Sequence, residues 1–177
     1  MNTPFLKYIQ ERLVIAPTLL ESMVATLSED DMDLNEGDGT MTIRDILIHL
    51  IYMEQTFWMM EIENILKRNG TLEPIPWKGL DHTTAMGNFN GKKLVRIFQE
   101  NRTENLELLH GINIKKRHLN RLGIDPELGK ITLKEVLSAW TAHDLSHVYQ
   151  ILRCLCYQFR LDVGPLKKHI KILYQNY

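Results

Sequence analysis

The chain has 177 residues, enough for one domain with a sizeable core and too few for two ordinary domains. We therefore expect residues 1–177 to form a single domain. The sequence is 44% hydrophobic and 24% charged with a formal net charge of −1, which is typical of a folded globular protein. It has no excess of basic residues to neutralise phosphates, so its charge argues against a nucleic-acid partner.

Cysteine use and hydropathy indicate where the protein works. Cys154 and Cys156 lie two positions apart on an expected helix and face different sides, so we interpret them as free thiols rather than a disulfide or redox pair. No segment approaches the roughly 18 apolar residues that a membrane span requires. Residues 1–20 show no clear secretion signal. We expect a cytoplasmic protein without a membrane partner.

Two helices are expected in the first 67 residues. Apolar residues at three- and four-residue spacing predict a helix over residues 5–27, which Pro17 either kinks or divides. The acidic, glycine-containing segment 28–40 is expected to be a loop. The sequence Thr42-Ile-Arg-Asp45 resembles a capping box and predicts the start of an apolar helix that continues to about residue 67.

The second half of the chain predicts two further long helices. A crossover of roughly twenty residues, about 70–90, is marked by prolines and glycines and is longer than the usual connection in a bundle. The third helix is expected over residues 92–110. A turn at 125–129 and a capping box from Thr132 then predict a fourth helix to about residue 159. The last element expected is a short basic helix over residues 166–174.

Four long helices are expected, and no segment shows the alternation of apolar and polar residues that is typical of a strand. The sequence therefore predicts an all-α fold. The expected architecture is an antiparallel four-helix bundle with a long crossover between helices 2 and 3. A long crossover allows these two successive helices to run parallel. Metal sites in bundles are built from side chains of facing helices, so the histidines on these helices are of interest.

Two histidines of the fourth helix share one face. His143 and His147 are four residues apart, so both rings can reach one metal ion. This spacing is weak evidence by itself, because short motifs also arise by chance. His49 lies in the apolar segment 46–52 of the second helix, where a lone histidine is more often a core residue than a ligand. Next to the pair, His49 becomes the candidate third ligand.

Three neutral imidazoles would leave one coordination position open. That arrangement is typical of catalytic rather than structural zinc sites. A metal ion there lowers the pKa of a bound water or thiol, or polarises a carbonyl group. Histidine ligation suits several divalent metals, so the sequence does not select one.

Several other polar residues have weaker claims. Asp144 is turned by about 100° from the adjacent ligand position, so we expect a supporting or surface role. Gln150, one turn after His147, is interpreted as a surface residue, with a hydrogen bond to a ligand ring as the alternative. Glu54 cannot point at the same spot as His49 and is expected in a salt bridge between helices. The other histidines are expected to be solvated or capping: His82, His110, His118 and His169.

Six segments of the chain occur in the order found in one known family. They are residues 42–51 with Glu54 following, 101–106, 125–129, 131–133, 140–150 and 163–165. On these segments the chain resembles the bacterial DinB/YfiT-like superfamily of four-helix-bundle metalloproteins, in the branch with His-Asp-x-x-His in the fourth helix. The resemblance covers nearly the whole chain.

The resemblance implies a divalent metal ion, such as zinc, nickel, iron or manganese, held by His49, His143 and His147 with water in the remaining positions. It also implies a homodimer. Relatives include transferases that use a low-molecular-weight thiol such as bacillithiol, a thiol-dependent isomerase and hydrolase-like members. Asp125 departs from the histidine common in relatives, and residues 76–81 fit only loosely, so no role is carried over to either.

These observations lead to three hypotheses of function. The first is a metal-dependent enzyme acting on a small-molecule substrate, such as a transferase in which a thiol cosubstrate attacks small electrophiles. The alternative is a non-enzymatic metal-binding or stress-associated dimer whose metal stabilises the bundle. The third is a bundle that binds an apolar ligand between its helices.

Overall fold

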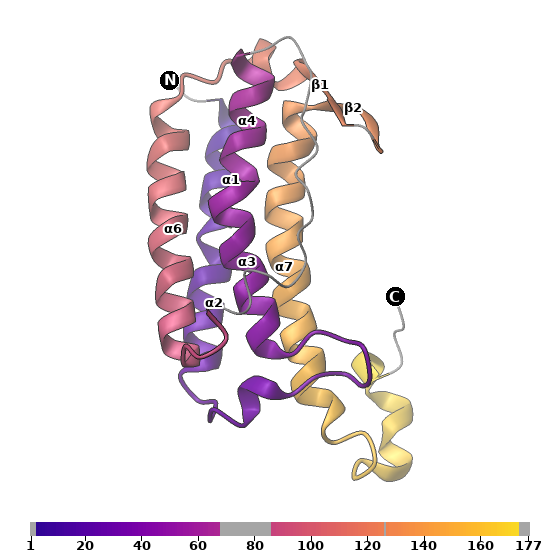
Figure 1. Ribbon diagram of the computed structural model, residues 1–177. Coiled ribbons are helices and arrows are strands. Elements are labelled where there is room, and N and C mark those ends of the chain that lie inside the picture. The colour runs from indigo at the N-terminus through magenta and orange to yellow at the C-terminus, as the bar shows by residue number, and fades with distance from the viewer. Residues whose placement is uncertain (1–2, 68–85, 126, 174–177) are drawn as a thin grey trace.

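The computed structural model is a four-helix bundle, as the sequence predicts (Figure 1). It describes residues 3–67, 86–125 and 127–173. Two of its four arms are interrupted helices, and two are continuous. The arms are α1 (Pro4–Leu13) with α2 (Ile15–Val24), α3 (Ile43–Thr56) with α4 (Trp58–Lys67), α6 (Gly91–Gly111), and α7 (Leu133–Tyr157).

The second and third arms run parallel, as the expected long crossover allows. In Figure 1, α3 and α4 rise from the lower end of the bundle to the upper end, and α6 rises in the same direction. The arms α1 to α2 and α7 run downward. Most of the expected crossover, with His82, falls in residues 68–85 and lies outside the described residues.

The first arm is interrupted at Val14, three residues before the proline that predicted a kink. Proline has no backbone N–H, so the carbonyl of Leu13, four residues before Pro17, lacks its helical donor. Arg102 of α6 supplies a replacement, because its Nη1 donates a hydrogen bond to this carbonyl. The break therefore lies at the acceptor that the proline leaves unpaired.

The second arm is interrupted at Phe57, where the sequence predicted a continuous helix. Its start is as expected, because Thr42 and Asp45 form a capping box. Near the break, Nδ2 of Asn105 donates to the backbone carbonyl of Glu54 at 2.8 Å. A side chain that reaches into the helical hydrogen-bond ladder is a known cause of a kink. No proline or glycine marks this position, so the break was not predictable locally.

A small hairpin departs from the expected all-helical pattern. Strands β1 (Leu122–Asp125) and β2 (Gly129–Thr132) pair antiparallel, with Leu122 opposite Thr132 and Asp125 opposite Gly129. Strands of four residues are too short for their alternation to be read from sequence. The turn between them was expected, and Gly129 takes a φ of +79° there.

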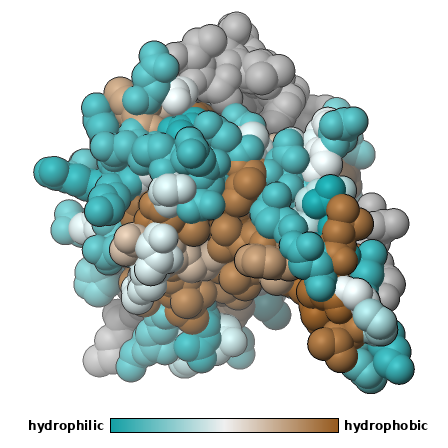
Figure 2. Space-filling view, turned by 90° about the horizontal axis from the view of Figure 1, so that it is seen from below, coloured by the Kyte–Doolittle hydropathy of each residue, from teal (hydrophilic) through white to brown (hydrophobic). Residues whose placement is uncertain are grey.

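The end of the chain also differs from expectation. The expected helix over residues 166–174 is replaced by two short 3-10 helices, Gly164–His169 and Lys171–Leu173. The chain after α7 leaves apolar side chains uncovered, since Phe159, Leu161 and Leu166 are all more than half exposed. The view from below shows apolar surface on the projecting segment and across the neighbouring end of the bundle (Figure 2). Few apolar contacts are therefore available to hold a regular helix here.

Two expectations from composition agree with the structure. Cys154 is buried and Cys156 half-buried, and both are free thiols. Burial, followed by the charge of Glu36, raises the pKa of Cys154 to about 11, so this thiol is unreactive at neutral pH. Within the described residues, no helix is long and apolar enough to cross a membrane.

A layer of buried polar side chains divides the core. The lower apolar cluster combines α2, α3, the start of α6 and the end of α7. The upper cluster combines α1, α4, the end of α6 and the start of α7. Between them lie four buried polar residues, one from α3, two from α6 and one from α7: Glu54, Arg102, Asn105 and Asp144.

Arg102 is the centre of this polar layer. Its Nη2 lies 2.7 Å from Oε1 of Glu54 and 2.7 Å from Oδ2 of Asp144. These three side chains are only 2%, 0% and 3% exposed. Nε1 of Trp140 donates to Oε1 of Glu54 at 2.8 Å, and Asn105 donates to Oε2 at 3.0 Å. The helix-to-helix salt bridge expected for Glu54 is confirmed.

Replacing Arg102 by methionine should reduce the free energy of unfolding by about 3–5 kcal/mol, because two buried carboxylates lose their counter-ion. Urea unfolding of the wild type and the variant measures the difference. Arg96→Met is the matched control, since Arg96 lies on the same helix in an exposed pair with Glu100 and should matter far less. An effect of Arg102→Met as small as that of Arg96→Met would contradict the role assigned to the layer.

Candidate metal centre

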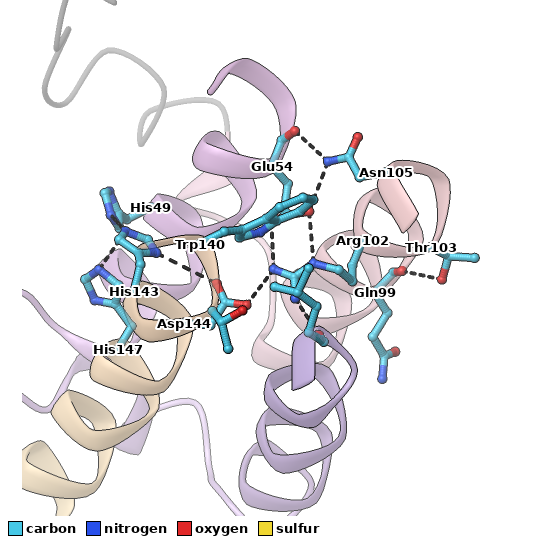
Figure 3. Close-up of polar contacts among 12 residues, drawn as sticks. His49, Glu54, Gln99, Arg102, Thr103, Asn105, Trp140, His143, Asp144 and His147 are labelled. Atoms are coloured by element: carbon cyan, nitrogen blue, oxygen red, sulfur yellow. Dashed lines mark hydrogen bonds and ion pairs between the residues drawn. The ribbon is translucent and has the colours of Figure 1, made fainter. Parts of the chain in front are cut away.

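The three histidines singled out by the sequence converge in the structure. His49 projects from α3, and His143 and His147 project from successive turns of α7 (Figure 3). Nε2 of His143 lies 3.0 Å from Nε2 of His49 and 3.2 Å from Nε2 of His147. All three rings are half-buried. In the described part of the chain, this is the one group of three or more such residues able to hold a metal ion.

The spacing of these nitrogens fits one shared metal ion. Nitrogens bound at about 2.0–2.1 Å to one tetrahedral ion lie about 3.3 Å apart. The observed separations of 3.0 and 3.2 Å are close to that value. Three neutral imidazole nitrogens that face one another cannot all be paired by hydrogen bonds, because each neutral ring carries only one proton. A bound cation would accept their lone pairs instead. The site thus has the donor set and the spacing of a three-histidine metal site.

Gln150 sets the proton of one ligand ring. Its Oε1 lies 2.9 Å from Nδ1 of His147, one helical turn away. With the amide oxygen as acceptor, Nδ1 carries the proton and Nε2 presents its lone pair to the site. The sequence favoured a surface role for Gln150, and the structure shows the alternative, a hydrogen bond to the candidate ligand.

Asp144 reaches the site from behind. It is buried, so it is not a surface residue, and its Oδ1 lies 3.7 Å from Nδ1 of His143. Its other oxygen forms the ion pair with Arg102. Figure 3 shows how this pair links the histidines to the polar layer. Asp144 therefore has the supporting position that the sequence offered as one of two expectations.

Aromatic rings form a wall against the central histidine. The rings of Trp58 and Trp140 are stacked, with centroids 5.8 Å apart and an interplanar angle of 10°. The edge of Trp58 meets His143, with centroids 5.2 Å apart. Both tryptophans are buried. Trp58 therefore packs against His143 and restricts its movement, and Trp140 stacks on Trp58.

Burial keeps two of the ligand rings neutral. It lowers the pKa of His49 to about 3, and the nearby His147 and His143 rings add to the effect. Burial and the neighbouring His143 lower the pKa of His147 to about 4. At neutral pH both rings are uncharged, as metal binding requires.

The other described histidines take no part in this site. His110 and His169 are exposed, and Nδ1 of His118 accepts a hydrogen bond from the backbone N–H of Lys115 at 3.2 Å. These are the solvated and capping roles expected from the sequence.

One buried acid was not predicted from the sequence. Glu61 of α4 is 3% exposed, and its Oε2 has no hydrogen-bond partner. Burial, followed by the charge of Asp125, raises its pKa to about 7. Glu61 lies one turn after Trp58, whose Nε1 is also buried without a partner. The sequence did not mark Glu61 as buried, because its context on an amphipathic helix resembles that of any surface glutamate.

Acidification of the metal-free protein should lower its free energy of unfolding between about pH 6.5 and 4. In this window the unfolded chain protonates His49 and His147, whereas the folded chain does not, so protons favour unfolding. Glu61 acts in the opposite sense between about pH 4.5 and 7, because only its folded form keeps a proton. Glu61→Gln should therefore steepen the loss of stability.

Urea unfolding at stepped pH with a chelator present measures both effects. His110→Ala is the control, because this exposed histidine lies at the end of α6, away from the metal site. Equal slopes for the wild type and Glu61→Gln would show that the carboxyl is not protonated in the folded chain.

Comparisons with known proteins agree with this fold. The model of the DinB superfamily matches residues 12–151. A solved structure of YfiT from Bacillus subtilis, described as a probable metal-dependent hydrolase with an unusual four-helix bundle topology, superposes with a TM-score of 0.68. The two chains are 17% identical over 87% of each, a likeness that supports the fold. No curated protein matches the sequence. Since the family model spans most of the chain, the protein belongs to the DinB superfamily.

Proposed function

We propose that this protein is a divalent-metal-dependent enzyme that acts on a small molecule at the three-histidine site. The convergence of three Nε2 atoms carries this proposal, since those of His49 and His147 lie 3.0 and 3.2 Å from that of His143. Burial holds the pKa values of His49 and His147 far below neutrality, so these two ligands are ready to bind without losing protons. Among the described residues no carboxylate or thiol joins the three histidines, so a divalent ion bound here would keep a coordination position for water or a substrate.

A divalent ion bound here would supply Lewis acidity, lowering the pKa of a water or thiol and polarising a carbonyl group. The chain supplies the rest of the site. His49, His143 and His147 present neutral donors, and Gln150 fixes the proton of His147 on Nδ1. Trp58 and Trp140 form an apolar wall beside His143.

For the reaction, we propose transfer of a low-molecular-weight thiol to a small electrophile. The thiolate sulfur would form a bond to an electrophilic carbon, the leaving group would depart with its electron pair, and the thiol proton would pass to solvent. Thiol transferases are among the members of the superfamily that the chain resembles, and this supports the choice. Hydrolysis is the second candidate, supported by the description of YfiT as a probable metal-dependent hydrolase.

The metal site has a direct test. Protein purified from cells grown with trace metals should contain close to one divalent ion per chain by elemental analysis, and His49→Ala or His147→Ala should remove most of it. His110→Ala, an exposed histidine outside the site, is the control and should keep the ion. Metal content below about 0.1 per chain, with no change in melting temperature on adding zinc, nickel or manganese, would contradict the site.

The reaction is tested by two substrate panels. Bacillithiol with small electrophiles tests thiol transfer, measured as loss of free thiol, and small esters, amides and lactones test hydrolysis. His147→Ala should reduce the active panel by at least about 100-fold, because one of three ligands is lost. Activity unchanged in His147→Ala would show that the reaction does not use this site.

The rival function is a metal that only stabilises the bundle. Ligands from α3 and α7 would tie these two helices together, and this alone raises stability. Bound metal, a raised melting temperature and inactivity in both panels would favour this rival. The homodimer implied by the family resemblance stays a prediction, which light scattering after size-exclusion chromatography tests.

A further inference from the structure

We propose that Asp144, held by Arg102, is a positioning residue that fixes the proton of His143 on Nδ1 and thereby turns its Nε2 lone pair toward the metal. This inference rests on the proposed metal site. The buried ion cluster of Glu54, Arg102 and Asp144 joins the helices, and in this proposal it also sets the tautomer of His143.

Two unsatisfied atoms face each other behind the site. Nδ1 of His143 is buried and has no hydrogen-bond partner, and the same holds for Oδ1 of Asp144. They are 3.7 Å apart, too far for a hydrogen bond and close enough for one to form after a shift of under about 1 Å. Buried polar groups without partners are rare, and these two complete each other.

Arg102 explains why Asp144 can serve this purpose. Its Nη2 pairs with Oδ2 of Asp144, which leaves Oδ1 turned toward His143 (Figure 3). The guanidinium is itself fixed by Glu54 through Nε and Nη2, at 3.1 and 2.7 Å. Asp144 is therefore anchored at one oxygen and available at the other. Two carboxylates and one guanidinium also carry one net negative charge, which favours a nearby dication.

The position of His143 makes its proton decisive. Its Nε2 is the central atom of the site, 3.0 Å from one neighbouring Nε2 and 3.2 Å from the other. A proton on this atom would point into the space that a metal ion needs. At His147, the neutral amide oxygen of Gln150 accepts the proton on Nδ1, so Nε2 carries none. At His143 the corresponding acceptor is a carboxylate, which holds an N–H more strongly.

Imidazole nitrogen NMR of the wild-type protein tests the proposal without any substitution. Two-bond proton–nitrogen spectra, assigned by loss of the His143 signals in His143→Ala, should show a protonated Nδ1 in both the metal-free and the zinc-loaded protein. A metal-free protein whose His143 carries its proton on Nε2 alone would overturn the proposal.

Two substitutions in the same cluster separate positioning from structure. Asp144→Asn keeps the shape of the side chain and removes the charge that holds the proton on Nδ1. Its zinc affinity, measured by competition with a chromophoric chelator, should fall by at least about 10-fold. Glu54→Gln removes the other carboxylate that faces Arg102 but contacts no histidine, so it should lower stability while changing zinc affinity by less than about threefold.

The outcomes are distinct. Equal loss of zinc affinity in Asp144→Asn and Glu54→Gln would show that the cluster acts only through the fold, and unchanged affinity in Asp144→Asn would also contradict positioning. If Asp144→Asn does not fold, the wild-type spectrum decides the question. A wild type that binds none of zinc, nickel and manganese would contradict the proposed function, whereas the proton on Nδ1 of His143 in the metal-free protein would still be measured.

Discussion

The buried guanidinium of Arg102 is the interaction on which the rest of this bundle depends. It pairs with carboxylates from two other arms, Glu54 and Asp144, and donates to the backbone of a third at Leu13. Burying a charge is costly unless every partner is in place. All four arms must therefore meet at one level for the chain to fold, and this requirement fixes their register more sharply than apolar packing above and below.

The two helix interruptions follow from the same layer. Pro17 leaves the carbonyl of Leu13 without a helical donor, and Arg102 uses it. Asn105, one turn later on α6, bonds the carbonyl of Glu54 beside the break at Phe57. Both breaks are thus joined to the same face of α6. Apolar clusters can slide or repack, whereas this set of directed bonds gives the three histidines a rigid support.

The sequence predicted the helical class and indicated the three histidines that lie together in the structure, but it predicted the polar layer only through the salt bridge of Glu54. Helix periodicity, two capping boxes and the spacing of His143 and His147 are local features, so they were readable without a structure. The partners of Arg102 are separated by dozens of residues, and an arginine on a long helix looks like a surface residue. The break at Phe57 was missed for the same reason, because it depends on a contact with the distant Asn105. The short hairpin was missed because strands of four residues are too short for their alternation to be read from sequence.

The polar layer that stabilises the bundle and the candidate metal site lie side by side in the bundle. Asp144 belongs to both, since one oxygen pairs with Arg102 and the other faces His143. A structure of the zinc-loaded protein tests this union most directly. We expect one ion bound to Nε2 of all three histidines, with Nδ1 of His143 within about 3.2 Å of Oδ1 of Asp144. An ion bound elsewhere, or a His143 ring turned away from Asp144, would contradict it.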